Sequence, residues 1–125
     1  MNIEKYKNHH FEDGGSTTTK EYTTFQNAYI KYLKEMCEAH GWTLTKVIKS
    51  HYQFSVFIKD ENYHYVYLSI CDVRYFHNKW YDHILVRGAV NDEDYKGLTN
   101  EYTDLPHLTE NIERIFRYLK RKDEK

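Results

Sequence analysis

The segment HYQFSVFIKDENYHYVYLSICDV, residues 51–73, decides the fold because it holds two alternating runs joined by a turn. In the first run, 51–60, every second residue is apolar: Tyr52, Phe54, Val56 and Ile58. KDEN at 59–62 is typical of a compact turn. In the second run, 63–73, aliphatic residues alternate with tyrosines: Val66, Leu68 and Ile70 against Tyr63, Tyr65 and Tyr67. We therefore predict an antiparallel hairpin with an aliphatic face and a tyrosine-bearing face.

Strand-like segments flank this hairpin on both sides. WTLTKVIKS (42–50) and WYDHILVRGAV (80–90) alternate in the same way, and RYFHNK (74–79) is a short connection. Consecutive strands with short connections predict a four-stranded antiparallel meander. NDEDYKGLTNEYTD (91–104) shows no apolar period, so we predict a loop there.

A first helix is predicted before the strands. Thr18 and Glu21 have the spacing of a capping box, which satisfies free backbone N–H groups at a helix start. Apolar residues then recur at helical spacing, and Gly41 is a plausible stop. The predicted helix covers 19–40.

A second amphipathic helix is predicted over 105–121. Asp104 can cap it, and Pro106 falls in the first turn, where a missing N–H is tolerated. The element order is then α-β-β-β-β-α. It predicts an α+β fold in which two helices pack on one face of a four-stranded antiparallel sheet. The opposite face is expected to be partly open and to carry many of the 13 tyrosines.

Length and composition predict one domain. The 125 residues are 40% hydrophobic and 30% charged, which allows a buried core. We expect a flexible N-terminal arm over 1–16, a single domain over 17–122 and a tail over 123–125. No run of 18 apolar residues and no secretory h-region is present, so we expect a cytoplasmic protein in whatever cell expresses it.

Charge is nearly balanced overall but clusters locally. The net charge is −1, whereas a generic nucleic-acid binder is clearly basic. The predicted second helix carries five cations between 114 and 122: Arg114, Arg117, Lys120, Arg121 and Lys122. This cluster is either a solvated helix face or a phosphate contact.

The predicted loop 91–104 has the opposite charge. Its carboxylates outnumber its one lysine, Lys96: Asp92, Glu93, Asp94, Glu101 and Asp104. It is either a solvated loop or a segment that occupies a basic groove on a partner. Its tyrosines, Tyr95 and Tyr102, favour the second interpretation, because long mixed loops often carry function.

The stretch after the third predicted strand ends in a charged corner. Asp72 and Arg74 point to the same face if the strand remains extended, and a network with Arg87 would fix the corner of the sheet. The alternative is a recognition edge, since Arg, Trp and Tyr dominate binding hot spots. That edge would expose Arg74, Tyr75, Trp80 and Tyr81.

Chemistry-bearing motifs are scarce. Four side chains could in principle form a tetrahedral zinc site, but they lack paired ligand spacing: Cys37, His40, Cys71 and His77. No phosphate-binding glycine loop or hydrolase motif is present. Asp82 and His83 are adjacent on a strand and should face opposite ways. We therefore predict a protein that is not an enzyme, with no catalytic residue, no metal site and no cofactor.

Part of the chain resembles a known group of proteins. YVYLSICDVRYF (65–76), WYDHILVRGA (80–89) and DYKG (94–97), with the following Asn100 and Tyr102, resemble small accessory proteins of phages, plasmids and conjugative elements of Gram-positive bacteria. The resemblance covers a little under half the chain. Anti-CRISPR inhibitors of Cas9 are the best-known class of such proteins, and they act by tight binding without a cofactor.

The resemblance implies an inhibitor that binds a CRISPR effector, or its ribonucleoprotein, and blocks nucleic-acid loading or cleavage. The partner-binding residues are then expected to be Arg74, Tyr75, Trp80, Tyr81, Asp92, Glu93, Asp94 and Tyr95. The alternative is an accessory protein that binds RNA or DNA through Arg114, Arg117, Lys120 and Arg121. Either protein is expected to be a monomer or a homodimer that does not contact a membrane.

Overall fold

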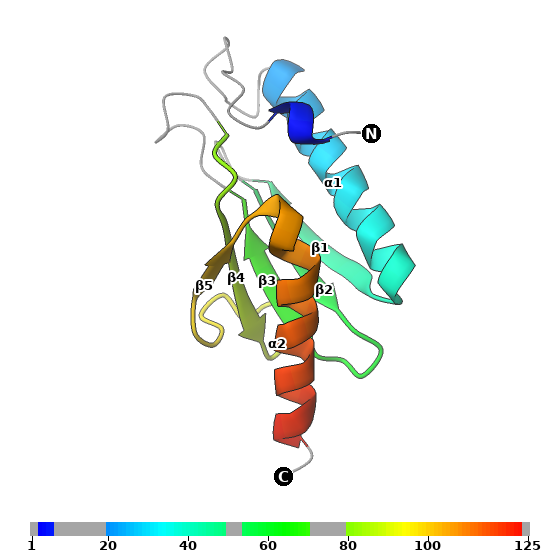
Figure 1. Cartoon of the computed structure of the whole chain (residues 1–125), viewed down its shortest axis with the longest axis vertical. Helices are drawn as coiled ribbons and strands as arrows, with labels where there is room; N and C mark the ends of the chain where they lie inside the picture. The colour runs from blue at the N-terminus through cyan, green and yellow to red at the C-terminus, as the bar shows by residue number, and fades with distance from the viewer. Residues whose placement is uncertain (1–2, 7–19, 50–53, 71–79, 124–125) are drawn as a thin grey trace.

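The computed structural model describes residues 3–6, 20–49, 54–70 and 80–123 (Figure 1). It has an α+β fold with an antiparallel sheet. The elements in chain order are η1 (Ile3–Tyr6), α1 (Lys20–His40), β1 (Thr43–Lys49), β2 (Phe54–Lys59), β3 (Tyr65–Ser69), β4 (Ile84–Ala89), β5 (Glu101–Thr103), η3 (Leu105–His107) and α2 (Leu108–Asp123).

Helix α1 agrees closely with the helix predicted over 19–40. It ends where expected, because Gly41 adopts a φ of 72°, a left-handed conformation that glycine reaches without steric cost. Thr18, the first half of the predicted capping box, lies outside the described residues. So does most of the predicted arm, since only 3–6 of 1–16 are described.

The sheet is a meander in the order β1-β2-β3-β4-β5, and every neighbouring pair is antiparallel. The predicted turn between β2 and β3 depends on Asp60, whose carboxylate accepts the N–H groups of Asn62 and His64, each at 2.9 Å. Tyr63 was predicted to lie in the third strand. It instead occupies this turn with a φ of 62° and is 69% exposed.

The sheet has five strands, so the prediction of four strands and a plain loop over 91–104 is wrong. Glu101–Thr103 forms β5, which pairs with β4 so that Glu101 lies opposite Val86. Three residues are too few to show a period in the sequence. Pairing with the exposed edge of β4, and not local propensity, makes this segment a strand.

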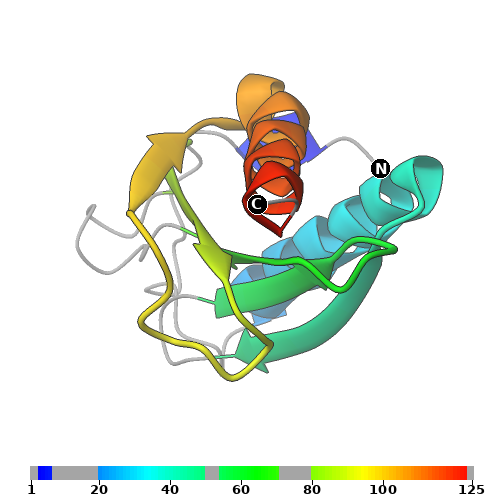
Figure 2. The same cartoon turned by 90° about the horizontal axis from the view of Figure 1, so that it is seen from below.

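The aliphatic face of the sheet is the core, as predicted. Val56, Val66, Leu68 and Val86 are fully buried there, in one cluster with apolar side chains of both helices. Helix α1 packs along β1, and α2 packs across β3 and β4. Figure 2 shows how the sheet curls around α2.

The second helical segment begins with a short 3-10 turn. Asp104 caps η3 as predicted, since its carboxylate accepts the N–H of His107 at 3.2 Å. The α-helix follows and runs to Asp123, beyond the predicted end at 121. Its apolar stripe is buried against the sheet: Leu108, Ile112, Ile115, Phe116 and Leu119.

Trp80 lies in the core, so the prediction that it is displayed on a recognition edge is wrong. Its side chain is 0% exposed, and its ring packs 5.4 Å from the rings of Phe25 and Tyr29 in α1. The apolar area of an indole explains this placement, because α1 offers an aromatic surface on which to bury it. Arg74 and Tyr75 of the same predicted edge lie outside the described residues, as does Asp72.

No helix in the described part of the chain is both long enough and apolar enough to cross a membrane.

Replacement of Trp80 tests this packing. We expect Trp80→Ala to lower the free energy of unfolding by about 3–5 kcal/mol, because it leaves a cavity in the core. Trp80→Phe should cost less, and Tyr118→Ala, at a side chain that is 50% exposed, should change stability by about 0.5 kcal/mol or less. Urea unfolding measures all three. A Trp80→Ala loss no larger than that of Tyr118→Ala would contradict the buried position.

Candidate functional site

The acidic segment 91–104 divides into structural and exposed carboxylates. Asp94 accepts the N–H of Gly97 at 2.9 Å and that of Val90 at 3.0 Å. These two hydrogen bonds, that of Gly97 foremost, lower the pKa of Asp94. Glu101 pairs with Arg114, and Asp104 caps η3. Only Asp92 and Glu93 remain at the tip of the turn.

The turn that carries these acids lies on the outer face of the sheet. Arg87 of β4 donates to the backbone oxygen of Tyr95 and, at 3.0 Å, to the side-chain oxygen of Asn100. The Tyr95 ring packs 5.5 Å from Phe57, which is fully buried although it points away from the helices. Gly97 permits this approach, because a Cβ there would lie 2.7 Å from Cδ of Arg87. The predicted open face is therefore partly covered.

Arg87 lies on the face of the sheet opposite the aliphatic core. Its guanidinium lies 4.5 Å from the centre of the Tyr67 ring, on the tyrosine-bearing face. This contact is a cation–π interaction. The predicted network with Asp72 and Arg74 falls outside the described residues.

The remaining predicted residues near β4 have mainly structural contacts. Tyr81 is half-buried and packs against the core cluster. Asp82 accepts the N–H of Leu105 at 2.7 Å and so fixes the start of η3. His83 stacks on Tyr102 of β5, with 4.7 Å between ring centres. Asp82 and His83 therefore have separate partners, as their opposite directions predicted.

The five cations of the basic half of α2, residues 114–122, are all exposed. Arg114 contacts Glu101 at 2.5 Å, and Arg117 lies 3.8 Å from Glu113. Lys120 and Arg121 make no ion pair within the described part of the chain. Arg114 and Arg121 share a helix face, because seven residues are close to two full turns. All four cations predicted for nucleic-acid contact thus reach solvent from one short stretch.

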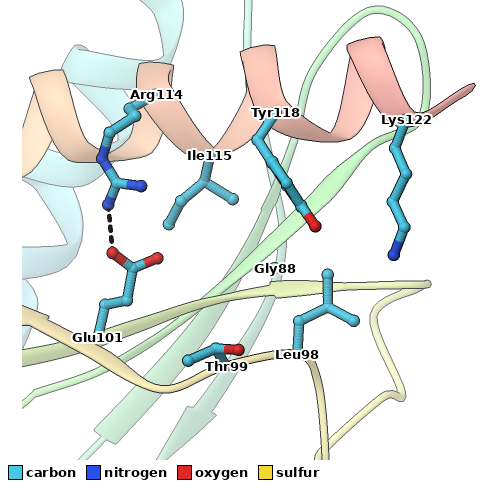
Figure 3. Close-up of a pocket in the computed structure, with 8 residues that line it drawn as sticks. All are labelled: Gly88, Leu98, Thr99, Glu101, Arg114, Ile115, Tyr118 and Lys122. Atoms are coloured by element: carbon cyan, nitrogen blue, oxygen red, sulfur yellow. Dashed lines mark hydrogen bonds and ion pairs between the residues drawn. The ribbon is translucent and has the colours of Figure 1, made fainter. Parts of the chain in front are cut away.

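A groove of about 500 Å³ runs beside this basic half, between α2 and the segment that joins β4 to β5 (Figure 3). Ligand sites in proteins have comparable volumes. Its lining combines apolar and charged residues: Gly88, Leu98, Thr99, Glu101, Arg114, Ile115, Tyr118 and Lys122. In Figure 3 the side chains of Tyr118 and Lys122 extend from the helix toward Leu98.

Most of the groove was not predicted. A glycine inside a strand, Gly88, can mark a close approach of other groups, and that signal is present in the sequence. Tyr118, in the middle of the cations, is a second signal. Neither Gly88 nor Tyr118 indicates a groove by itself, because the groove forms only when α2 packs over β4. That packing is a tertiary contact and is not visible in the sequence.

A histidine clamp holds the C-terminal end of α2. Both ring nitrogens of His64 contact carboxylates: Nδ1 lies 3.0 Å from Asp60 and Nε2 lies 2.5 Å from Asp123. Burial lowers the pKa of His64, but the hydrogen bonds to Asp123 and Asp60 outweigh it and raise the pKa above 6.5. In its protonated form, the ring ties the turn between β2 and β3 to the C-terminal end of α2 through both carboxylates.

Two of the four possible zinc ligands, Cys37 and His40, lie in the described part of the chain, and they are not arranged to bind a metal. Cys37 is buried in the core, and burial raises the pKa of its thiol to about 12. His40 is engaged by the backbone oxygen of Met36 and by Glu113. Among the described residues, no group of three or more His, Cys, Asp or Glu is placed to hold a metal. Cys71 and His77 lie outside them.

Comparison with protein-family models, with curated proteins and with solved structures yields no match to this chain.

The clamp makes a prediction about pH. Because the folded state raises the pKa of His64, its contribution to stability is fully present below pH 6.5 and is lost as the pH rises through the folded-state pKa. Urea unfolding of the protein and of His64→Asn should therefore show a larger stability difference at pH 6 than at pH 8.5.

His107, which pairs with Asp104, also has a raised pKa but is well exposed. His107→Asn is the matched control and should show the smaller pH-dependent difference. A His64→Asn difference that is equal at both pH values would contradict a charged clamp.

Proposed function

We propose that this chain is a binding protein without catalytic activity that contacts its partner through the basic half of α2. The observation that carries the proposal is the uncompensated charge of that surface. Residues 114–122 hold five cations and no carboxylate. Arg114 pairs with Glu101 and Arg117 lies 3.8 Å from Glu113, whereas Lys120, Arg121 and Lys122 are exposed without an ion pair in the described part of the chain. Such a patch attracts an anionic surface.

The acidic turn ranks below this surface as a docking site. Three of the five carboxylates in 91–104 already have partners within the protein, namely Asp94, Glu101 and Asp104. Asp92 and Glu93 remain, and the ammonium of Lys46 lies next to them, 3.4 Å from the backbone oxygen of Asp92. The negative charge of the segment is therefore partly offset within the protein, by Arg114 at Glu101 and by Lys46 at the tip of the turn.

The proposed partner is a CRISPR effector ribonucleoprotein such as that of Cas9. This choice rests on the resemblance to accessory proteins of mobile elements. A ribonucleoprotein presents guide-RNA phosphates, which suit the cations of α2, next to protein surface. Occupation of that region would block nucleic-acid loading or cleavage. The protein is proposed to act stoichiometrically and without a cofactor.

Free RNA or DNA is the second candidate partner. Tyr118, which is 50% exposed among the cations, favours it. An exposed ring beside a basic track is the arrangement by which proteins stack and hold single-stranded nucleic acid.

A cleavage assay with purified Cas9, guide RNA and target DNA tests the main proposal. We expect dose-dependent inhibition and a co-eluting complex on gel filtration. Arg117→Gln/Lys120→Gln/Arg121→Gln should weaken inhibition about tenfold, because three exposed charge contacts are together worth about 1.5 kcal/mol. The matched control, Lys20→Gln/Lys31→Gln/Lys34→Gln, removes three exposed cations of α1 and should inhibit normally.

The order of addition distinguishes a block of guide-RNA loading from a block of cleavage. Inhibition only when the protein precedes guide RNA indicates blocked loading, and inhibition of the assembled complex indicates blocked cleavage. No inhibition, together with oligonucleotide binding that falls steeply with salt, would replace the effector by free nucleic acid.

The acidic turn provides an independent prediction. Asp92→Asn/Glu93→Gln should leave inhibition within about twofold of the unmodified protein, because surface charges outside the contact contribute little. Asp94 is kept in this variant, since its loss would release the turn. Glu35→Gln/Glu38→Gln removes two exposed carboxylates of α1 as the matched control. Strong loss of inhibition in the turn variant alone would place the contact at the turn instead of α2.

A further inference from the structure

We propose that the groove beside α2 binds an extended acidic peptide segment of a protein partner, with an apolar side chain on its floor and a carboxylate at Lys122. The proposal rests on the binding function proposed above and names the chemistry of one part of that contact.

The floor of the groove accepts an apolar group. It is formed by Ile115 of α2, by Leu98 and by Gly88, which has no side chain to fill the space. A Cβ built on Gly88 would lie 3.0 Å from Cδ1 of Leu98, so a larger residue there would require Leu98 to shift from its place in the groove lining. Leu98 is 39% exposed, and coverage by a ligand would remove this apolar surface from water.

The two ends of the groove differ in charge. At one end, Arg114 is neutralised by Glu101 at 2.5 Å. At the other end, Lys122 has no carboxylate partner within the described residues, and its ammonium lies 5.9 Å from the centre of the Tyr118 ring. A ligand with a single negative charge at the Lys122 end therefore complements the groove (Figure 3).

The dimensions favour a peptide. From Arg114 to Lys122 the helix rises about 12 Å, which an extended chain spans in about four residues. A nucleic-acid backbone fits less well, because it would place successive phosphates beside Glu101 and over an apolar floor. The phosphate contacts proposed for Arg117, Lys120 and Arg121 lie outside the groove lining.

Titration with defined peptides tests the proposal. The probe is an end-blocked peptide with leucine, phenylalanine and aspartate in succession, and its two controls carry asparagine for aspartate or serine for both apolar residues. Amide chemical shifts of the full chain report the binding site. We expect saturable shifts at Gly88, Leu98 and Thr99, with about tenfold weaker binding of each control peptide.

Protein variants locate the contacts. Lys122→Gln should weaken binding of the aspartate peptide about tenfold but not that of the asparagine peptide. Lys120→Gln, which removes a cation that does not line the groove, should leave both unchanged. Gly88→Ala should weaken all peptides, and its shift spectrum reports whether the fold is retained.

Absent shifts, shifts centred elsewhere, or equal binding of the three peptides would overturn the peptide site. Displacement of the peptide from the groove by a short RNA would also overturn it, in favour of nucleic acid. Failure of the peptide site is distinct from failure of the proposed function, because inhibition that depends on Arg117, Lys120 and Arg121 is measured without any peptide.

Discussion

The burial of one apolar stripe of α2 against β3 and β4 is the constraint on which the rest of the surface depends. Ile112, Ile115, Phe116 and Leu119 occupy the concave side of the sheet and fix the rotation of the helix. With that rotation fixed, the cations of 114–122 must face solvent, and one edge of the helix must form a wall of the groove. The His64 clamp holds the far end of the same helix in place.

The other face of the sheet is organised by a different interaction. Arg87 lies over Tyr67 and holds the turn 91–97 through the backbone of Tyr95. This arrangement turns a charged, aromatic segment into cover for Phe57. Asp94, Glu101 and Asp104 of the acidic segment have partners within the protein, whereas Lys120 and Arg121 have no ion pair among the described residues, which favours α2 as the binding surface.

Periodicity predicted the parts of the fold that depend on local pattern. The first helix, the antiparallel hairpin of β2 and β3 within 54–70, the cap at Asp104 and the stop at Gly41 all follow from spacing and turn chemistry. The features that the sequence did not predict depend on tertiary packing. Trp80 is buried because α1 supplies aromatic partners, β5 forms because β4 has a free edge, and the groove exists because α2 crosses Gly88. The sequence predicted two candidate binding surfaces, the acidic segment 91–104 and the basic half of α2. Burial of the apolar stripe of α2, which turns its cations toward solvent, favours the second.

Hydrogen–deuterium exchange of the chain, free and bound to the Cas9 ribonucleoprotein, tests the central claim most directly because it maps the contact without a substitution. If α2 is the contact surface, binding should slow amide hydrogen exchange at 114–122 and 98–101 and leave exchange at 91–96 unchanged. Slower exchange confined to 91–96, with 114–122 unaffected, would contradict α2 as the contact surface.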